Sequence, residues 1–220
     1  MTYDVGRYNS LISRAAINWE YFRGHYQDMG PNRYHCTIGG AGIGDWSIVN
    51  GLPARRNNTG CPVMTPAIAS VVDATGAFSV EFVAAGSHRD GILVLSQELA
   101  GGWYCSSAAG NYYLATRTAA MGLGRYIAFG TSAAQKSTDH YAATINTAAL
   151  TGAAWRNGVP IAVAFVNLGV PSNSAVRAVY GHFPSLVGTQ IGVLDRAYPF
   201  ALTNEDAACL FGAAHAMFGV

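Results

Sequence analysis

An Asn-Gly step between two strand-like runs constrains the fold more than any other feature of this chain. Residues 153–156 and 160–166 both suit β-strands, and Asn157-Gly158 separates them. Asn-Gly is the commonest pair in two-residue turns whose twist matches that of paired strands. We therefore predict a β-hairpin at residues 153–166.

Further strands are expected on either side of this hairpin. Residues 141–147 can lie beside it as a third strand, and residues 190–195 can form a fourth. Strands joined by short turns pair in the antiparallel sense. The second half of the chain is therefore predicted to be mainly antiparallel sheet.

The first half of the chain contains its clearest strand at Ala77–Ala85. Side chains alternate across a strand. One face is therefore formed by Phe78, Val80 and Phe82, and the other by Ser79, Glu81 and Val83. Further strand-like runs lie at residues 17–22, 34–38, 46–49, 92–96 and 125–130. This gives a dozen or so short strands separated by turn signals, which is typical of an all-β sandwich or barrel.

A helix is predicted at the end of the chain, over residues 203–218. Thr203 is a good N-cap, and Glu205 and Asp206 place negative charge in the first turn. Apolar residues then recur at three- and four-residue spacing: Ala207, Leu210, Phe211, Ala214, Met217 and Phe218. The plain interpretation of this apolar stripe is a helix that covers the edge of the sandwich. The alternative is a helix that packs on a partner chain.

Length and composition indicate one domain over residues 1–220. A chain of 220 residues with 50% hydrophobic content can bury a full core. We expect a core of about residues 17–211, an N-terminal arm at 1–16 and the C-terminal helix at 203–218. Charged residues make up only 11%, against roughly 25% in average globular proteins. This low charge indicates either a surface partly covered by neighbouring chains or ordinary drift in composition.

Charge and hydropathy argue against nucleic-acid and membrane partners. The net charge is +1, and the only basic cluster is Arg55-Arg56. No run of 18 apolar residues occurs, so no membrane span is predicted. Residues 1–21 lack the basic start and apolar middle of a secretory signal. We therefore expect the chain to act in the cytoplasm or to leave the cell within a larger assembly.

The four cysteines predict buried thiols rather than disulfides or a metal site. They stand at Cys36, Cys61, Cys105 and Cys209, without C-x-x-C spacing. A chain without an export signal stays in a reducing compartment, where thiols are the usual state.

Four segments, in order, resemble the laminin G-like branch of the concanavalin A-like lectin/glucanase superfamily. They are residues 19–38 (an aromatic strand followed by an Asp-containing turn), residues 78–83 (FSVEFV), Trp155-Arg156-Asn157-Gly158-Val159, and residues 191–211 (a closing strand followed by Ala-Leu-Thr and a helix). Met29 and Pro31 depart from the usual Ser and Gly of the opening motif, and residues 198–200 are an insertion. The resemblance implies a two-sheet antiparallel jelly-roll sandwich.

The resemblance also implies a class of function. Similar domains are common in tail, fibre and head-surface proteins of tailed bacteriophages, which assemble in the host cytoplasm without a signal peptide. We therefore expect a virion protein that packs against other virion subunits or itself as a homo-oligomer and contacts host glycans. A stand-alone lectin is the first alternative and a glycan-cleaving enzyme the second.

Catalytic chemistry is not expected. Glycosidases need paired carboxylates, about 5–5.5 Å apart for retention. The only four glutamates of this chain, Glu20, Glu81, Glu98 and Glu205, are widely separated in sequence and form no such pair. The triad-like residue types at 87–90 (SHRD) fit a polar turn better, because sequence neighbours seldom adopt triad geometry. If the chain cleaves glycans after all, Glu81 is the residue expected to carry the reaction.

No cofactor is predicted, with one alternative left open. Asp139-His140 fits a solvated strand edge better than a metal pair, and the six His show no zinc spacing. The resemblance implies that a loop Asp can hold calcium, and Asp28 lies in a suitable loop.

The candidate glycan site is a second predicted hairpin, centred on Gly110-Asn111. Aromatic faces stack on pyranose rings while neighbouring amides bind the hydroxyls. The site residues predicted on this ground are Trp103, Tyr104, Asn111, Tyr112 and Tyr113. The competing interpretation is that these rings fill the core.

Overall fold

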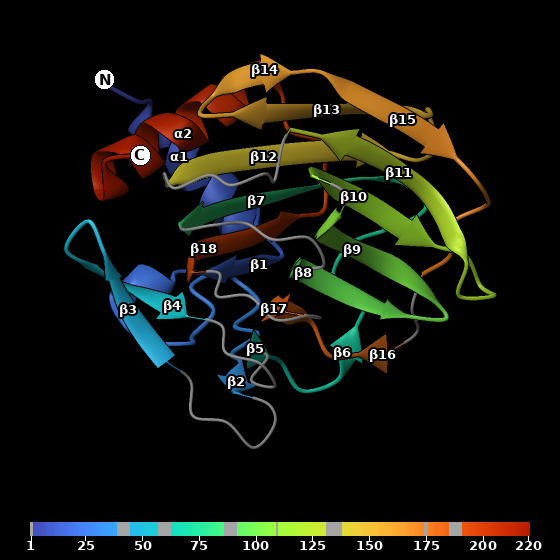
Figure 1. The fold of residues 1–220 in the computed structure, drawn as a ribbon, viewed down its shortest axis with the longest axis horizontal. Helices are drawn as coiled ribbons and strands as arrows, with labels where there is room; N and C mark the ends of the chain where they lie inside the picture. The colour runs from blue at the N-terminus through green and yellow to red at the C-terminus, as the bar shows by residue number, and fades with distance from the viewer. Residues whose placement is uncertain are drawn as a thin grey trace.

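The computed structural model describes residues 2–38, 45–56, 63–85, 92–108, 110–130, 138–173, 176–184 and 191–220. Two antiparallel sheets pack face to face, and two α-helices lie against one of them (Figure 1). The predicted all-β two-sheet sandwich with a short C-terminal helix is confirmed. None of the helices in the described ranges is long and apolar enough to cross a bilayer.

The first sheet, sheet A, lies next to the helices. Its strands are, in order, β14 (Val159–Ile161), β13 (Thr151–Arg156), β12 (Asp139–Asn146), β7 (Ala77–Ala85), β18 (Ile191–Tyr198), β4 (Leu52–Arg56) and β3 (Asp45–Val49). Strand β1 (Ile17–Trp19) pairs with the other end of β18. The predicted third strand, β12, lies beside the hairpin as expected, whereas β12 and β7 separate the predicted fourth strand, β18, from the hairpin.

The second sheet, sheet B, forms the opposite layer. Its strands are, in order, β15 (Val163–Asn167), β11 (Leu123–Phe129), β10 (Asn111–Arg117), β9 (Gly101–Ala108), β8 (Ile92–Leu99), β17 (Tyr180–Pro184), β5 (Val63–Met64) and β2 (Thr37–Ile38). A two-stranded ribbon, β6 (Ile68–Ala69) with β16 (Val176–Arg177), lies beside it.

The Asn157-Gly158 hairpin is confirmed. Both turn residues have positive φ, 51° and 73°, and β13 pairs with β14 across them. The run at residues 160–166 is not one strand, however. It leaves sheet A after Ile161 and enters sheet B at Val163. A strand that changes sheets closes the edge of a sandwich, and alternation in sequence gives no sign of this switch.

The core lies between the sheets and is rich in aromatic rings. Phe78, Val80 and Phe82 of β7 point into it, as the alternation predicts. The opposite face of β7 is buried as well, because the helices cover it. Strand β7, in the middle of sheet A, is therefore buried on both of its faces.

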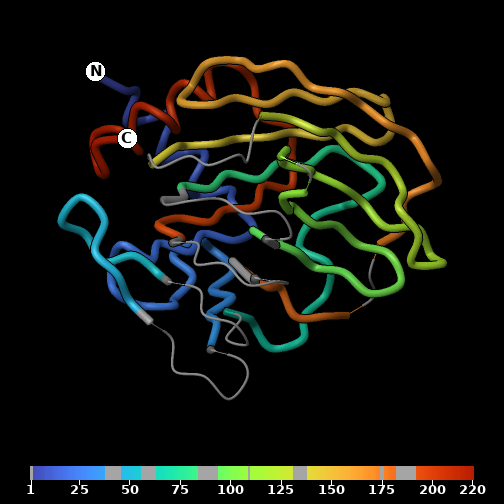
Figure 2. Tube along the Cα trace, viewed as in Figure 1, coloured from blue at the N-terminus to red at the C-terminus, as the bar shows by residue number. Residues whose placement is uncertain are grey.

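The helices are α1 (Val5–Arg14) and α2 (Asn204–Phe218), with a short 3-10 turn at Tyr21–Arg23. Thr203 caps α2 in a reciprocal capping box with Asp206. The helices are joined by Arg7, whose Nε lies 2.8 Å from Asp206 Oδ1. Both chain ends therefore lie together (Figure 2).

Some elements were not predicted from the sequence. The expected N-terminal arm at residues 1–16 contains helix α1. Strands β4 and β5 were not predicted either, and Arg55 on β4 is fully buried rather than part of an exposed basic cluster.

Candidate functional site

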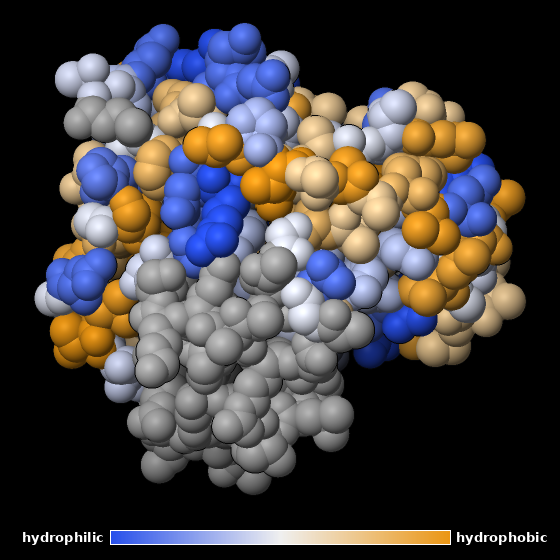
Figure 3. Space-filling view, turned by 45° about the horizontal axis from the view of Figure 1, so that its top comes forward, coloured by the Kyte–Doolittle hydropathy of each residue, from blue (hydrophilic) through white to orange (hydrophobic). Residues whose placement is uncertain are grey.

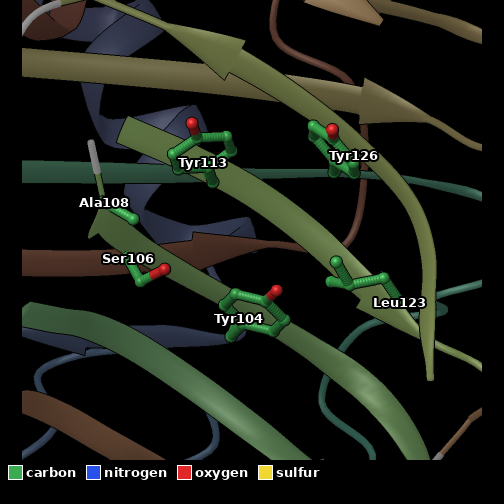
Figure 4. Close-up of a pocket in the computed structure, with 6 residues that line it drawn as sticks. All are labelled: Tyr104, Ser106, Ala108, Tyr113, Leu123 and Tyr126. Atoms are coloured by element: carbon green, nitrogen blue, oxygen red, sulfur yellow. The ribbon is translucent and has the colours of Figure 1, made fainter. Parts of the chain in front are cut away.

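Three tyrosines on adjacent strands surround a hollow on the outer face of sheet B. Tyr104 lies on β9, Tyr113 on β10 and Tyr126 on β11 (Figure 4). The rings of Tyr113 and Tyr126 meet edge to face, with centroids 5.7 Å apart. The hollow has a volume of about 210 Å³ and is completed by Ser106, Ala108 and Leu123. We call these six residues the aromatic groove.

The alternation of β9 places one aromatic residue in the core and its neighbour in the groove. Trp103 and Cys105 are fully buried, whereas Tyr104 and Ser106 are half-buried on the outer face. The register of β9 depends on Gly102, which has a φ of 93°. A Cβ at this position would lie 2.1 Å from the carbonyl oxygen of Gln97, so only glycine fits.

A charged pair borders the groove beside Tyr104. Arg117 Nε lies 2.8 Å from Glu98 Oε2, and the Arg117 guanidinium carbon lies 4.8 Å from the centre of the Tyr104 ring. Burial raises the pKa of Tyr104 above its usual value, although Arg117 opposes this effect. The Tyr104 hydroxyl therefore stays protonated at physiological pH and can donate a hydrogen bond.

The predicted glycan-site residues lie in two places, some at the surface and some in the core. Tyr104 and Tyr113 line the groove, and Asn111 is half-buried at the start of β10. Trp103 and Tyr112 are fully buried in the core. Tyr112 packs against Phe82 and Tyr141, with centroids 5.1 Å and 4.9 Å away. Trp103 and Tyr112 therefore stabilise the sandwich and cannot contact a surface ligand.

Three residues of the groove were not among the predicted site residues: Tyr126, Leu123 and Ser106. Tyr126 lies on the run at residues 125–130 that was predicted to be a strand, so its element was known. Its position in the groove depends on the pairing of Tyr126 with Ala115 and of Tyr113 with Ala128. Sequence periodicity gives the face of a residue within one strand but does not give this register between strands.

A second set of polar residues is buried beneath the helices, on the outer face of sheet A. Arg196 on β18 is at its centre: Nη1 donates to Glu81 Oε2 at 3.2 Å, and Nη2 donates to Glu20 Oε1 at 3.1 Å. Nη2 also donates to the hydroxyl of Tyr8, on α1, at 2.9 Å. We call this set the Arg196 network.

Three further side chains complete the Arg196 network. His140 Nε2 lies 3.0 Å from Glu81 Oε1, and the Tyr198 hydroxyl donates to Glu81 Oε2 at 2.5 Å. Asn18 Oδ1 accepts from Arg196 Nε at 2.7 Å. Although burial by itself raises the pKa of a carboxyl group, Arg196, His140 and Tyr198 lower the pKa of Glu81 to about 2.

The Arg196 network corrects two expectations. Asp139-His140 is buried rather than solvated, and the two side chains have separate partners: Asp139 binds Arg156 while His140 faces Glu81. Glu20 and Glu81, remote in sequence, both contact Arg196. Their side chains are 5% and 0% exposed, so a substrate cannot reach them in this structure.

Asp28, the residue left open for calcium, organises its own loop. Its Oδ1 accepts from the backbone N–H groups of Asn18 and Gly30, at 2.9 and 2.8 Å, and its Oδ2 accepts from that of Tyr34 at 2.7 Å. Among the described residues, no group of three or more His, Cys, Asp or Glu side chains could hold a metal ion.

The remaining sequence candidates are thiols and loops. Cys36, Cys105 and Cys209 are buried free thiols, as predicted. Burial raises the pKa of Cys105 well above its usual value, which keeps the thiol protonated. Cys61 and the SHRD segment at 87–90 lie outside the described residues.

The fold is similar to that of toxin receptor-binding domains. The receptor binding domain of botulinum neurotoxin C/D mosaic serotype matches with a TM-score of 0.67 and 12% identity, over 91% of this chain and 51% of that chain. The binding domain of Paraclostridial Mosquitocidal Protein 1 matches with a TM-score of 0.68 and 14% identity, over 91% of this chain and 52% of that chain. A third match is a structure of botulinum neurotoxin type C, whose cell entry depends on two ganglioside molecules. Its TM-score is 0.66 and its identity 12%, over 93% of this chain and 52% of that chain.

These matches establish a shared fold. The chain spans about half the length of the solved chains it matches. No protein-family model matches this chain, and no curated protein matches it. The laminin G-like resemblance and the bacteriophage origin therefore stay predictions.

Proposed function

We propose that this chain is a non-enzymatic adhesive domain that binds a carbohydrate in the aromatic groove. The observation that carries the proposal is the set of three tyrosines on neighbouring strands around one open hollow. Monomeric sandwiches bury most of their aromatic rings. Tyrosines gathered on an outer face are characteristic of contact surfaces, because the ring packs while the hydroxyl stays hydrated.

The groove matches the chemistry of a sugar ring. A pyranose has an apolar face of C–H groups, which packs on an aromatic ring, and an equatorial rim of hydroxyls. Tyr104, Tyr113 and Tyr126 supply rings, and their hydroxyls with that of Ser106 can both donate and accept hydrogen bonds. At about 210 Å³ the hollow is smaller than small-molecule pockets of roughly 300–1,000 Å³. It therefore fits one sugar unit of a longer chain better than an enclosed substrate.

The groove supports binding rather than cleavage. None of its six lining residues is an acid, and Glu98, which borders it through Arg117, is held in an ion pair by that arginine. Glycan hydrolysis by the usual route needs two carboxylates on either side of the scissile bond. The structural neighbours also support binding rather than cleavage, since one is a receptor-binding domain and another interacts with gangliosides.

The test is a glycan array followed by calorimetric titration of any glycan that binds. Tyr104→Ala and Tyr126→Ala are expected to weaken binding at least about tenfold each, the scale of a central aromatic contact. The matched control is Trp46→Ala, which removes an exposed ring from β3 of the other sheet. No glycan binding, or binding that both tyrosine variants leave unchanged, would contradict the proposal.

A second candidate function is packing against other subunits of a virion, as a homo-oligomer or with different proteins. Leu168, Val170 and Val176 are 61%, 74% and 57% exposed. Apolar residues gather on the right-hand part of the surface in Figure 3. Exposed apolar side chains of this size favour covering by another chain. Light scattering of the purified chain and immunoblotting of purified particles test this candidate, and a monomer absent from particles would exclude it.

A further inference from the structure

A second hollow lies next to the aromatic groove and differs from it in charge. It is lined by Glu98, Leu99, Arg117, Met121 and Arg177 and has a volume of about 170 Å³. Among its described lining residues, two arginines and one glutamate give a net charge of +1. None of the six residues of the aromatic groove is basic.

Arg177 is the residue that distinguishes this second hollow. Arg117 is neutralised by Glu98 at 2.8 Å. The guanidinium of Arg177 has no ion pair or hydrogen bond within the described part of the chain, and its Nε is buried without an acceptor. Its one contact of note is the ring of Tyr180, with the guanidinium carbon 5.7 Å from the ring centre. Nε itself is closed off from outside, but the Arg177 side chain as a whole is half-buried and lines the hollow, so its positive charge favours an oxyanion there.

The two hollows are joined through Arg117. This side chain lines the second hollow and also stacks over Tyr104, which lines the groove. The connection between β10 and β11 provides a common wall, because Met121 lines one hollow and Leu123 the other. A ligand that stacks on Tyr104 and passes Arg117 therefore enters the hollow that Arg177 lines.

We infer that the two hollows form one site for an acidic glycan, in which a sugar ring stacks in the aromatic groove and a carboxylate or sulfate binds Arg177. This inference rests on the proposed function. Guanidinium presents a planar set of donors that matches an oxyanion, and its charge strengthens each hydrogen bond. The carboxylate of Glu98 does not compete for Arg177, because Arg117 holds it.

The experiment uses matched pairs of immobilised glycans that differ only in the acidic group. The carboxylate pair is sialylated lactose and lactose, and the sulfate pair is carboxyl-reduced chondroitin sulfate before and after desulfation. The acidic member of at least one pair is expected to bind at least tenfold more tightly than its neutral partner. Arg177→Ala is expected to remove this difference and to leave neutral binding within twofold. The pair that responds identifies the acidic group.

The controls separate this inference from the proposed function. Arg14→Ala removes a positive charge from α1, on the other side of the molecule, and is expected to leave the acidic preference intact. Arg177→Lys keeps the charge but loses the planar donor set, so an intermediate preference is expected. Equal binding of acidic and neutral partners would overturn the inference and leave the proposed function standing. Failure of every glycan on the array would overturn both.

Discussion

The outer faces of the two sheets use similar side chains for opposite purposes. On sheet A, helices α1 and α2 cover Arg196, Glu81 and their partners, which are almost completely buried. On sheet B, the pair Arg117 and Glu98 is 30% and 24% exposed and borders an open groove. Both faces contain arginine, glutamate and tyrosine, but only one has a cover. Burial of the polar residues, rather than their identity, decides which face stabilises and which can bind.

The covered face has stringent requirements. Each charge on it must have a partner, because a lone buried charge is far more costly than the pair. Arg196 meets this condition by contacting Glu81 on β7, Tyr8 on α1 and Glu20 just after β1. The Arg196 network therefore ties α1 and the segment after β1 to β7 and β18. The open face has no such requirement, since water solvates its charges.

The largest expected difference between the faces is the effect of removing an arginine. Arg196→Met leaves two buried carboxylates without their cation, and the free energy of unfolding should fall by about 3–5 kcal/mol. Arg117→Met, the matched change on sheet B, should alter it by less than about 1 kcal/mol. Urea unfolding at pH 7 measures both. Similar losses for the two variants would show that the faces do not differ in this way.

The next largest effect is the dependence of stability on pH. The pKa of Glu81 falls from an unfolded value of 4.5 to about 2 in the folded protein. The charged form is thus favoured by folding, so its stabilising contribution is complete above pH 4.5 and is lost as the pH falls toward 2. The expected loss is on the order of 3 kcal/mol.

Urea unfolding between pH 7 and pH 3 checks this dependence, with Glu81→Gln as the comparison. The variant should be less stable at pH 7, and its stability should fall less steeply below pH 4.5. Parallel pH curves for the two proteins would exclude Glu81 as the source of the dependence.

The smallest expected effect comes from single hydroxyl groups. Tyr8→Phe removes an acceptor from the buried Arg196 guanidinium and should reduce the free energy of unfolding by about 1–2 kcal/mol. It should also speed hydrogen exchange in α1, which this bond ties to sheet A. Tyr126→Phe, the same change in the open groove, should leave stability within about 0.5 kcal/mol. Equal effects of the two changes would mean that the hydroxyl of Tyr8 is not a structural contact.

Local pattern was enough to predict much of the fold. The Asn157-Gly158 turn needs two residues that tolerate positive φ, and the structure gives them 51° and 73°. The alternation of Ala77–Ala85 correctly assigned Phe78 and Phe82 to the core. Thr203 and the apolar stripe after it gave the terminal helix. Each of these features depends on residues within a few positions of one another.

The candidate site could be predicted only in part. The hairpin of β9 and β10 was predicted from the sequence. Which of its aromatic rings face the core and which face the surface was not predicted. Trp103 and Tyr112 point inward, while Tyr104 and Tyr113 point outward. Alternation shows that neighbours oppose each other, yet both members of each pair are aromatic, so hydropathy cannot decide which faces the core. Tyr126 lies in the groove because of the register between β10 and β11, and sequence periodicity gives no information about that register.

Sequence by itself therefore determined the strands, their turns and the capped helix at the end of this chain, because short-range sterics and alternation act between near neighbours. Only the tertiary structure decided which sheet face is covered and which is open. It brought Arg196 to Glu81 across 115 positions and to Tyr8 across 188. Such contacts depend on how two layers and two helices pack in space, and the free energy that selects them exists only once the core has formed.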